Sequence, residues 1–204
     1  MIGRHLLPQL KKDLFKGKII SILGPRQVGK TTLVRELAKQ IEPGYLYLNG
    51  DLSSVQDLLS SNSLANLKAA TQGAKLVVLD EAQRISDVGL KLKILVDELP
   101  EVQLLITGSS SLDLAFGTNE PLTGRKFQHY LFPISFSELV DNQGFAKALD
   151  QLEQRLIFGS YPEVINESGQ ERRYLELISE SYLYKDLLHQ PGIRRVDLLQ
   201  KILR

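Results

Sequence analysis

The segment that most constrains this chain is Gly24-Pro-Arg-Gln-Val-Gly-Lys-Thr-Thr32, which follows the apolar run 18–23. It has the pattern G-x-x-x-x-G-K-T and leads into 32–41, whose leucines and isoleucine fall on one helical face. Glycines let such a loop curl so that backbone N–H groups point at a phosphate, and the positive end of the next helix adds attraction. The sequence therefore predicts a phosphate-binding loop, with Lys30 at the β- and γ-phosphates and Thr31 on Mg²⁺.

Every residue of this loop is a candidate contact to the nucleotide. Arg26 is a candidate to clamp a phosphate or to pair with an acidic residue of a lid. An ordinary glycine-rich turn is the alternative, but the apolar run before the loop and the helical pattern after it favour the phosphate site. The candidate nucleotide-binding residues are Gly24, Pro25, Arg26, Gln27, Val28, Gly29, Lys30, Thr31 and Thr32.

A second apolar run, 74–80, ends in Asp80 and is followed directly by Glu81. Such a run is typical of a buried parallel strand, and open α/β sheets bind ligands at the carboxyl ends of their strands. An acidic pair after a strand is by itself more often structural. The phosphate loop upstream changes this interpretation, because the metal ion that accompanies a bound nucleotide needs a carboxylate ligand. We therefore expect Asp80 to hold Mg²⁺ through water and Glu81 to polarise the attacking water.

Two further polar positions follow later predicted strands. Thr107 ends the fourth strand, and we expect it to contact the γ-phosphate or the water, with Ser109 and Ser110 as substitutes. The alternative is a serine-rich loop that caps the next helix. Arg125 begins the fifth strand and is a candidate to stabilise γ-phosphate charge, in cis or from a neighbouring subunit. A surface arginine or a salt bridge is the plainer interpretation.

Strands and helices alternate along the first two thirds of the chain, which implies an α/β fold with a parallel sheet and right-handed crossovers. From residue 135 onward the pattern is helical. The strands are predicted at 18–23, 45–49, 74–80, 102–107 and 125–132, and the helices before residue 135 at 4–16, 32–41, 53–71 (one or two helices), 88–99 and 111–116.

The composition narrows the class of protein. The 204 residues contain no cysteine, which excludes disulfides and thiolate metal sites. The amino terminus lacks the apolar core of a signal peptide, and no apolar stretch could span a bilayer, so we expect a cytoplasmic protein without a membrane partner. Residues 1–43 hold nine Lys and Arg against three Asp and Glu, a bias too weak to predict nucleic-acid binding.

The motifs, taken in order, resemble those of prokaryotic AAA-type P-loop ATPases, AAA+ and STAND-like proteins with a C-terminal domain of unknown function, DUF4143. The resemblance implies a three-layer sandwich around a mainly parallel five-stranded sheet in the ASCE order 5-1-4-3-2, followed by a helical segment. It also implies that adenine is held partly by Ile2-Gly-Arg4. The matching segments are 24–32, 80–83, 105–110, 123–125, 131–138, 159–163 and 182–186.

The same resemblance suggests how the chain is divided. It implies an ATPase core over 1–134, a helical lid or linker over 135–190, and the start of a winged-helix-like segment over 191–204. Because members of the family continue well beyond such a segment, we expect this chain to be truncated.

We therefore predict Mg²⁺-dependent hydrolysis of ATP to ADP that drives a conformational switch. A regulatory module with little turnover is the main alternative, in which a homo-oligomer or a protein partner supplies an arginine. A helicase is suggested by Asp-Glu-Ala-Gln (80–83), but further helicase motifs are not found. A small-molecule kinase would need its own acceptor pocket. The catalytic candidates are Lys30, Glu81, Thr107 and Arg125, and the metal ligands Thr31 and Asp80.

Overall fold

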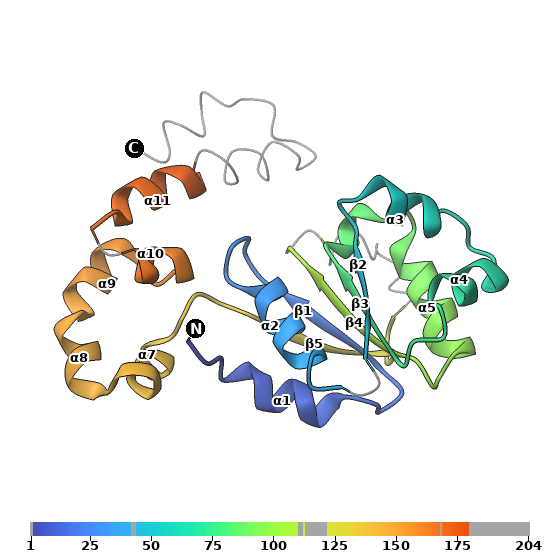
Figure 1. Ribbon diagram of the computed structural model, residues 1–204, viewed down its shortest axis with the longest axis horizontal. Helices are drawn as coiled ribbons and strands as arrows, with labels where there is room; N and C mark the ends of the chain where they lie inside the picture. Colours follow the sequence, from blue (N-terminus) through green and yellow to red (C-terminus); the bar gives the residue numbers. More distant parts are fainter. Residues whose placement is uncertain (1, 42–43, 110–111, 113–121, 168, 180–204) are drawn as a thin grey trace. The chain divides into compact units, whose positions relative to one another are not determined.

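The computed structural model describes residues 2–41, 44–109, 112, 122–167 and 169–179 (Figure 1). It divides into two compact units, Met1–Phe132 and Pro133–Arg204. The segment predicted as a helix at 111–116 lies outside the described residues except for Leu112, and so does the expected winged-helix start at 191–204. None of the helices in the described ranges combines the length and the apolar character that crossing a bilayer requires.

A five-stranded parallel sheet forms the centre of the first unit. Its order is β2-β3-β4-β1-β5, which is the predicted order 5-1-4-3-2 read from the other edge. The fold class, that of P-loop NTPases, is thereby confirmed. The strands are β1 (Ile19–Leu23), β2 (Leu46–Asn49), β3 (Leu76–Asp80), β4 (Gln103–Gly108) and β5 (Lys126–Tyr130).

The three inner strands are buried along their whole length, whereas the edge strands β2 and β5 are only partly buried. This explains the sequence pattern, because a parallel strand covered on both faces needs a continuous apolar run. Since all five strands run the same way, their carboxyl ends meet at one edge of the sheet. The segments that follow β1, β3 and β4 must therefore lie close together.

Helices cover both faces of the sheet, with α1 and α2 on one side and α3, α4 and α5 on the other (Figure 1). The segment 53–71, predicted to form one or two helices, forms two. Leu67 and Leu92 join the core between the sheet and α4 and α5. The helical elements are α1 (Leu6–Asp13), α2 (Lys30–Ala38), α3 (Ser53–Leu58), α4 (Leu64–Ala70), the short 3₁₀ helix η1 (Ala82–Arg84) and α5 (Val88–Glu98).

The described part of the second unit is helical, as the sequence predicts. Its first helix begins with a capping box, in which the Ser135 hydroxyl accepts from the Glu138 N–H and the Glu138 carboxylate accepts from the Ser135 N–H. A role for this unit as a lid stays a prediction. The helices are α7 (Phe136–Gln143), α8 (Phe145–Asp150), α9 (Leu152–Phe158), α10 (Pro162–Asn166) and α11 (Glu171–Ile178).

One close approach of backbone fixes where the phosphate loop begins. The Leu131 N–H, just after β5, donates to the Leu23 carbonyl at 2.7 Å, so the chain passes directly against Gly24. A Cβ atom at position 24 would lie 2.1 Å from the Leu131 carbonyl oxygen. Glycine is needed here because backbone atoms, unlike the end of a flexible side chain, cannot move aside without disturbing the sheet.

We expect Gly24→Ala to lower the free energy of unfolding by about 1–3 kcal/mol, the usual cost of overpacking. Urea denaturation of the 204-residue chain measures it. Gly3→Ala is the matched control, because no heavy atom of the described structure lies within 4 Å of a Cβ placed there. Equal denaturation midpoints for the two variants would contradict the packing argument.

Candidate functional site

The loop at 24–29 leaves the carboxyl end of β1 and enters α2 at Lys30. Gln27 and Gly29 have positive φ angles of 62° and 96°, so the backbone curls instead of extending. Gly29, the residue before the helix, has no side chain with which to cap it. The first N–H groups of a helix have no partner within the helix, and uncapped they form an anion-binding site.

Lys30 is buried at 5% exposure, and its ammonium group is held within the curl of the loop. Nζ donates to the carbonyl oxygens of Gly24 and Pro25, both at 2.8 Å. A buried ammonium needs such acceptors, since desolvation of an unpaired charge is costly. The geometry places a positive charge beside the N–H groups that open the helix, which suits a dense negative charge such as a triphosphate.

Asp80 ends β3 and is 3% exposed. Its Oδ2 accepts from the Thr31 hydroxyl at 2.7 Å and from the Tyr47 hydroxyl at 2.5 Å, and its Oδ1 accepts from the Thr107 hydroxyl. The structure thus brings together Thr31, Asp80 and Thr107, three residues singled out from the sequence. Tyr47, on β2, is a fourth member that no motif predicts.

These residues fit a magnesium ion. A hydroxyl has one proton and two lone pairs, so Thr31, which donates its proton to Asp80, keeps lone pairs for a cation. Hydroxyl and carboxylate oxygens are the hard ligands that Mg²⁺ prefers. In the described residues, no group of three or more His, Cys, Asp or Glu is placed so that it could hold a metal ion. Such a small donor set suits an ion that also takes phosphate oxygens and water, as Mg²⁺ does in nucleotide sites.

Glu81 follows Asp80 in a left-handed conformation, with φ 53° and ψ 45°. Its backbone N–H donates to the Thr107 hydroxyl oxygen at 3.2 Å, and its carboxylate accepts from Gln83 Nε2 at 2.5 Å. A residue with a side chain adopts this conformation at a cost that the surroundings must offset, and such residues gather at functional sites. Gln83, in η1, is a second neighbour that sequence reasoning missed.

Thr107 is fully buried, at 0% exposure. Its single hydroxyl donates to Asp80 and accepts from the Glu81 N–H, so it joins the two acidic residues. The predicted contact to the γ-phosphate is not tested by this geometry. Of the two substitutes, Ser109 is buried nearby after β4, and Ser110 lies outside the described residues.

Arg125 is not brought to this site. It precedes β5, and its carbonyl accepts from the Ile19 N–H at the amino end of β1. The phosphate loop lies beyond the other end of β1, and a strand of five residues rises about 16 Å. Arg125 Nε instead pairs with Asp97 at 2.7 Å, and this hydrogen bond lowers the pKa of Asp97. The cis arrangement predicted for Arg125 does not agree with this placement, and the trans arrangement is not tested.

Arg4, in the segment expected beside adenine, contacts the loop backbone. Its Nη1 donates to the Val28 carbonyl at 2.7 Å, and its Nη2 donates to the Phe132 carbonyl at 2.5 Å. The amino-terminal segment therefore contacts the phosphate loop directly. Its contact to adenine stays a prediction.

A parallel sheet in this order, with an anion-binding loop after β1 and a buried carboxylate after β3, is the arrangement of P-loop nucleotide-binding domains. A comparison with known families agrees, because the AAA_14 family, described as an AAA domain, matches residues 16–140. The chain belongs to this family of P-loop ATPase domains.

Two relatives, uncharacterised proteins of Mycobacterium bovis and Mycobacterium tuberculosis, are 34% identical to the chain over 124 residues. The match covers 60% of this chain and 26% of each relative, so the chain spans about a quarter of their length. A solved STAND protein with a tetratricopeptide repeat sensor from Pyrococcus horikoshii aligns with 92% of this chain and 34% of its own, at TM-score 0.55 and 15% identity. At that identity the likeness shows the fold alone.

We expect Arg125→Ala to leave the dissociation constant for ATP within about twofold in the monomeric chain, because an exposed ion pair remote from the loop contributes little. Equilibrium binding of a fluorescent ATP analogue measures it. Asp97→Ala breaks the same pair from the other side and is the matched control. A tenfold weakening by Arg125→Ala alone would show that the arginine does reach the nucleotide.

Proposed function

We propose that this domain binds ATP with Mg²⁺ and hydrolyses it to ADP, and that the reaction drives a conformational switch. The observation that carries the proposal is the hydrogen bond from Thr31 to Asp80 at the base of the loop that holds Lys30. The Thr31 hydroxyl lies in the first turn of the helix that follows the curled anion-binding loop, so this hydroxyl and the Asp80 carboxylate make a site for a metal next to a site for a phosphate chain.

Phosphate binding is assigned to the loop. The backbone N–H groups of residues 25–31 and the Lys30 ammonium face the β- and γ-phosphates, and Lys30 exchanges its bonds to loop carbonyls for bonds to phosphate oxygens. The exchange costs little, because the ammonium is already desolvated and positioned. Thr31 and Asp80 hold Mg²⁺, which when bound neutralises charge on the phosphate oxygens.

Orientation of the attacking water is assigned to Glu81. Gln83 fixes the carboxylate oxygen Oε2, and the Thr107 hydroxyl fixes the backbone N–H of the same residue. The second carboxylate oxygen, Oε1, is the one that we assign to the water. An acid beside the metal-binding aspartate favours water as the phosphate acceptor over a small molecule, which is why we prefer hydrolysis to kinase activity.

A regulatory nucleotide-binding module is the second candidate, and the position of Arg125 favours it. Catalysis in related phosphate chemistry often depends on an arginine that stabilises γ-phosphate charge. With Arg125 at the amino edge of the sheet, a second subunit or a protein partner would have to supply that group. Turnover by this chain alone would then be slow, and ATP binding would be the switching event.

The finer family assignment, with a C-terminal DUF4143 domain and a cytoplasmic location, is also part of the proposal. The family assignment is supported by the order of the motifs in the sequence, including those at 131–138 and 159–163, and the location is the one expected from the sequence. ATP and ADP are the ligands that we assign. The oligomer and the client protein are not assigned.

Lys30→Ala should weaken ATP binding by about 10- to 100-fold, the worth of one charge-assisted hydrogen bond. Titration with a fluorescent ATP analogue measures the dissociation constant. Lys39→Ala removes an exposed lysine that follows the other end of the same helix and is the matched control. Unchanged affinity in Lys30→Ala would refute the loop assignment.

Glu81→Gln should lower kcat by about 10²- to 10⁴-fold, the usual contribution of a general base, while ATP affinity stays nearly constant. Phosphate release under saturating ATP measures kcat. Glu98→Gln, at the exposed end of α5, is the control. Wild-type turnover in Glu81→Gln would end the water-orienting role, and tight ATP binding without turnover by the wild-type chain would favour the regulatory module.

A further inference from the structure

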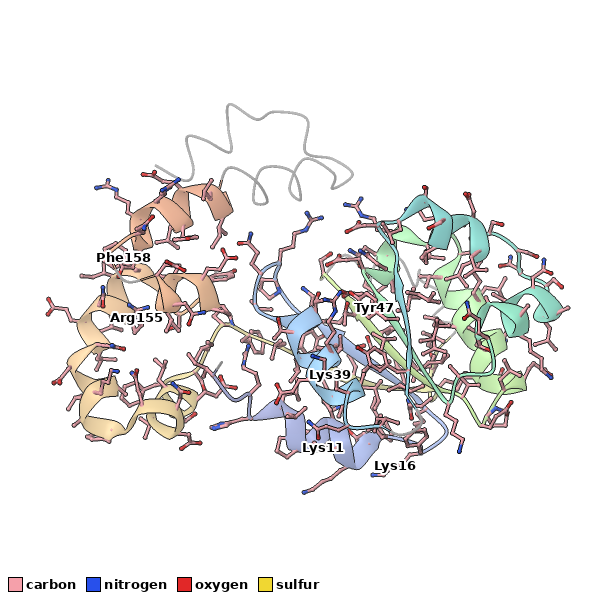
Figure 2. The ribbon with its side chains drawn as sticks, viewed as in Figure 1. Lys11, Lys16, Lys39, Tyr47, Arg155 and Phe158 are labelled. Atoms are coloured by element: carbon pink, nitrogen blue, oxygen red, sulfur yellow. The ribbon has the colours of Figure 1, made fainter. Side chains whose placement is uncertain are left out.

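Tyr47 makes the third hydroxyl contact to Asp80, beside those of Thr31 and Thr107. Its hydroxyl donates to Oδ2 at 2.5 Å, the oxygen that also accepts from Thr31. Tyr47 belongs to the edge strand β2, which pairs with β3, and lies on the side of the sheet where α2 runs (Figure 2). Asp80 is therefore fixed from α2, β2 and β4 together.

Arg35 holds the Tyr47 ring from the helix side. Its guanidinium carbon lies 4.5 Å from the ring centroid, within the range of cation–π attraction. Arg35 follows Thr31 by four residues on α2, so the two side chains share one face of the helix. The same face of α2 thus contacts Asp80 directly through Thr31 and indirectly through Arg35 and Tyr47.

A phenol has one proton, and Tyr47 donates it to Oδ2 of Asp80. This bond is a geometric constraint on the carboxylate, because it fixes the direction in which Oδ2 points.

We propose that Tyr47 is a positioning residue that orients the Asp80 carboxylate for the Mg²⁺ of the bound nucleotide, with Arg35 holding the tyrosine ring. The inference rests on the proposed function, because it concerns the same metal. A ligand carboxylate is effective only when its oxygens are held in one orientation, and replacing such a supporting group commonly costs 10- to 100-fold in metal affinity or activity. Loss of the Tyr47 hydroxyl is expected to weaken Mg²⁺ binding and to leave phosphate binding, which depends on the loop and Lys30, nearly unchanged.

The test compares Tyr47→Phe with wild type in binding a fluorescent ATP analogue, once in EDTA and once across a Mg²⁺ titration. Phenylalanine keeps the ring under Arg35 and removes only the hydroxyl. We expect the dissociation constant in EDTA to stay within about twofold. The Mg²⁺ concentration that gives half of the gain in affinity should rise about tenfold or more.

Tyr45→Phe is the matched control, because it removes a phenol two residues earlier on the same segment. Among the described residues, the hydroxyls that bond to Asp80 are those of Thr31, Tyr47 and Thr107. Tyr45→Phe should therefore behave as wild type in both titrations. Arg35→Met keeps the Tyr47 hydroxyl but removes the cation above the ring, and we expect a smaller rise in the Mg²⁺ requirement of about two- to fivefold.

Thermal unfolding of each variant checks that the fold is retained. If Tyr47→Phe fails to fold, the Mg²⁺ requirement of Arg35→Met decides the proposal. An unchanged Mg²⁺ requirement in Tyr47→Phe, with wild type binding ATP and responding to Mg²⁺, overturns the positioning role alone. Equal weakening in EDTA and in Mg²⁺ also overturns it, because that pattern marks a structural effect. A wild-type chain that does not bind ATP overturns the proposed function, and the positioning role with it.

Discussion

The site depends on one buried charge, the carboxylate of Asp80. At 3% exposure it has lost most of its hydration, which is costly unless hydrogen bonds replace it. Three hydroxyls from α2, β2 and β4 do so, and each comes from an element packed on or beside β3. The carboxylate therefore holds α2, the helix after the phosphate loop, against the sheet. Because both of its oxygens need hydrogen-bond donors, the elements that would bind phosphate and metal are fixed relative to one another.

The parallel sheet makes this convergence possible. Because β1, β3 and β4 run in one direction, the phosphate loop, Asp80 and Thr107 all emerge at the carboxyl edge although they are far apart in the sequence. The continuous apolar runs of these strands predict the sheet, and the motif after β1 predicts which edge carries the site. The same rule explains Arg125. A residue that precedes a parallel strand lies at the opposite edge from a loop that follows one, so the cis assignment conflicts with the sheet that the sequence itself predicts.

Tyr47 and Gln83 could not be predicted in this way. The strand that contains Tyr47 is recognisable, but its role depends on the register between β2 and β3, in which Tyr47 pairs with Val78 and Asn49 with Asp80. Which residue of β3 lies opposite a given residue of β2 depends on the patterns of both strands together, so the sequence around Tyr47 does not by itself identify its neighbour. Gln83 approaches Glu81 only because the chain turns through a left-handed residue into η1, a conformation that sequence preferences disfavour for glutamate.

Thr107 shows why the two acidic residues can differ in role although they are adjacent. A hydroxyl has one proton, and the Asp80 carboxylate accepts it, so the Thr107 oxygen is left to accept from the Glu81 N–H. The Asp80 carboxylate accepts from Thr31. The backbone of Glu81 is in a left-handed conformation, and the Glu81 carboxylate accepts from Gln83 instead of Thr31. One buried hydroxyl thus separates the carboxylate that we assign to the metal from the carboxylate that we assign to the water molecule. Valine has the same shape as threonine but could satisfy neither neighbour, whereas serine keeps the hydroxyl that both require.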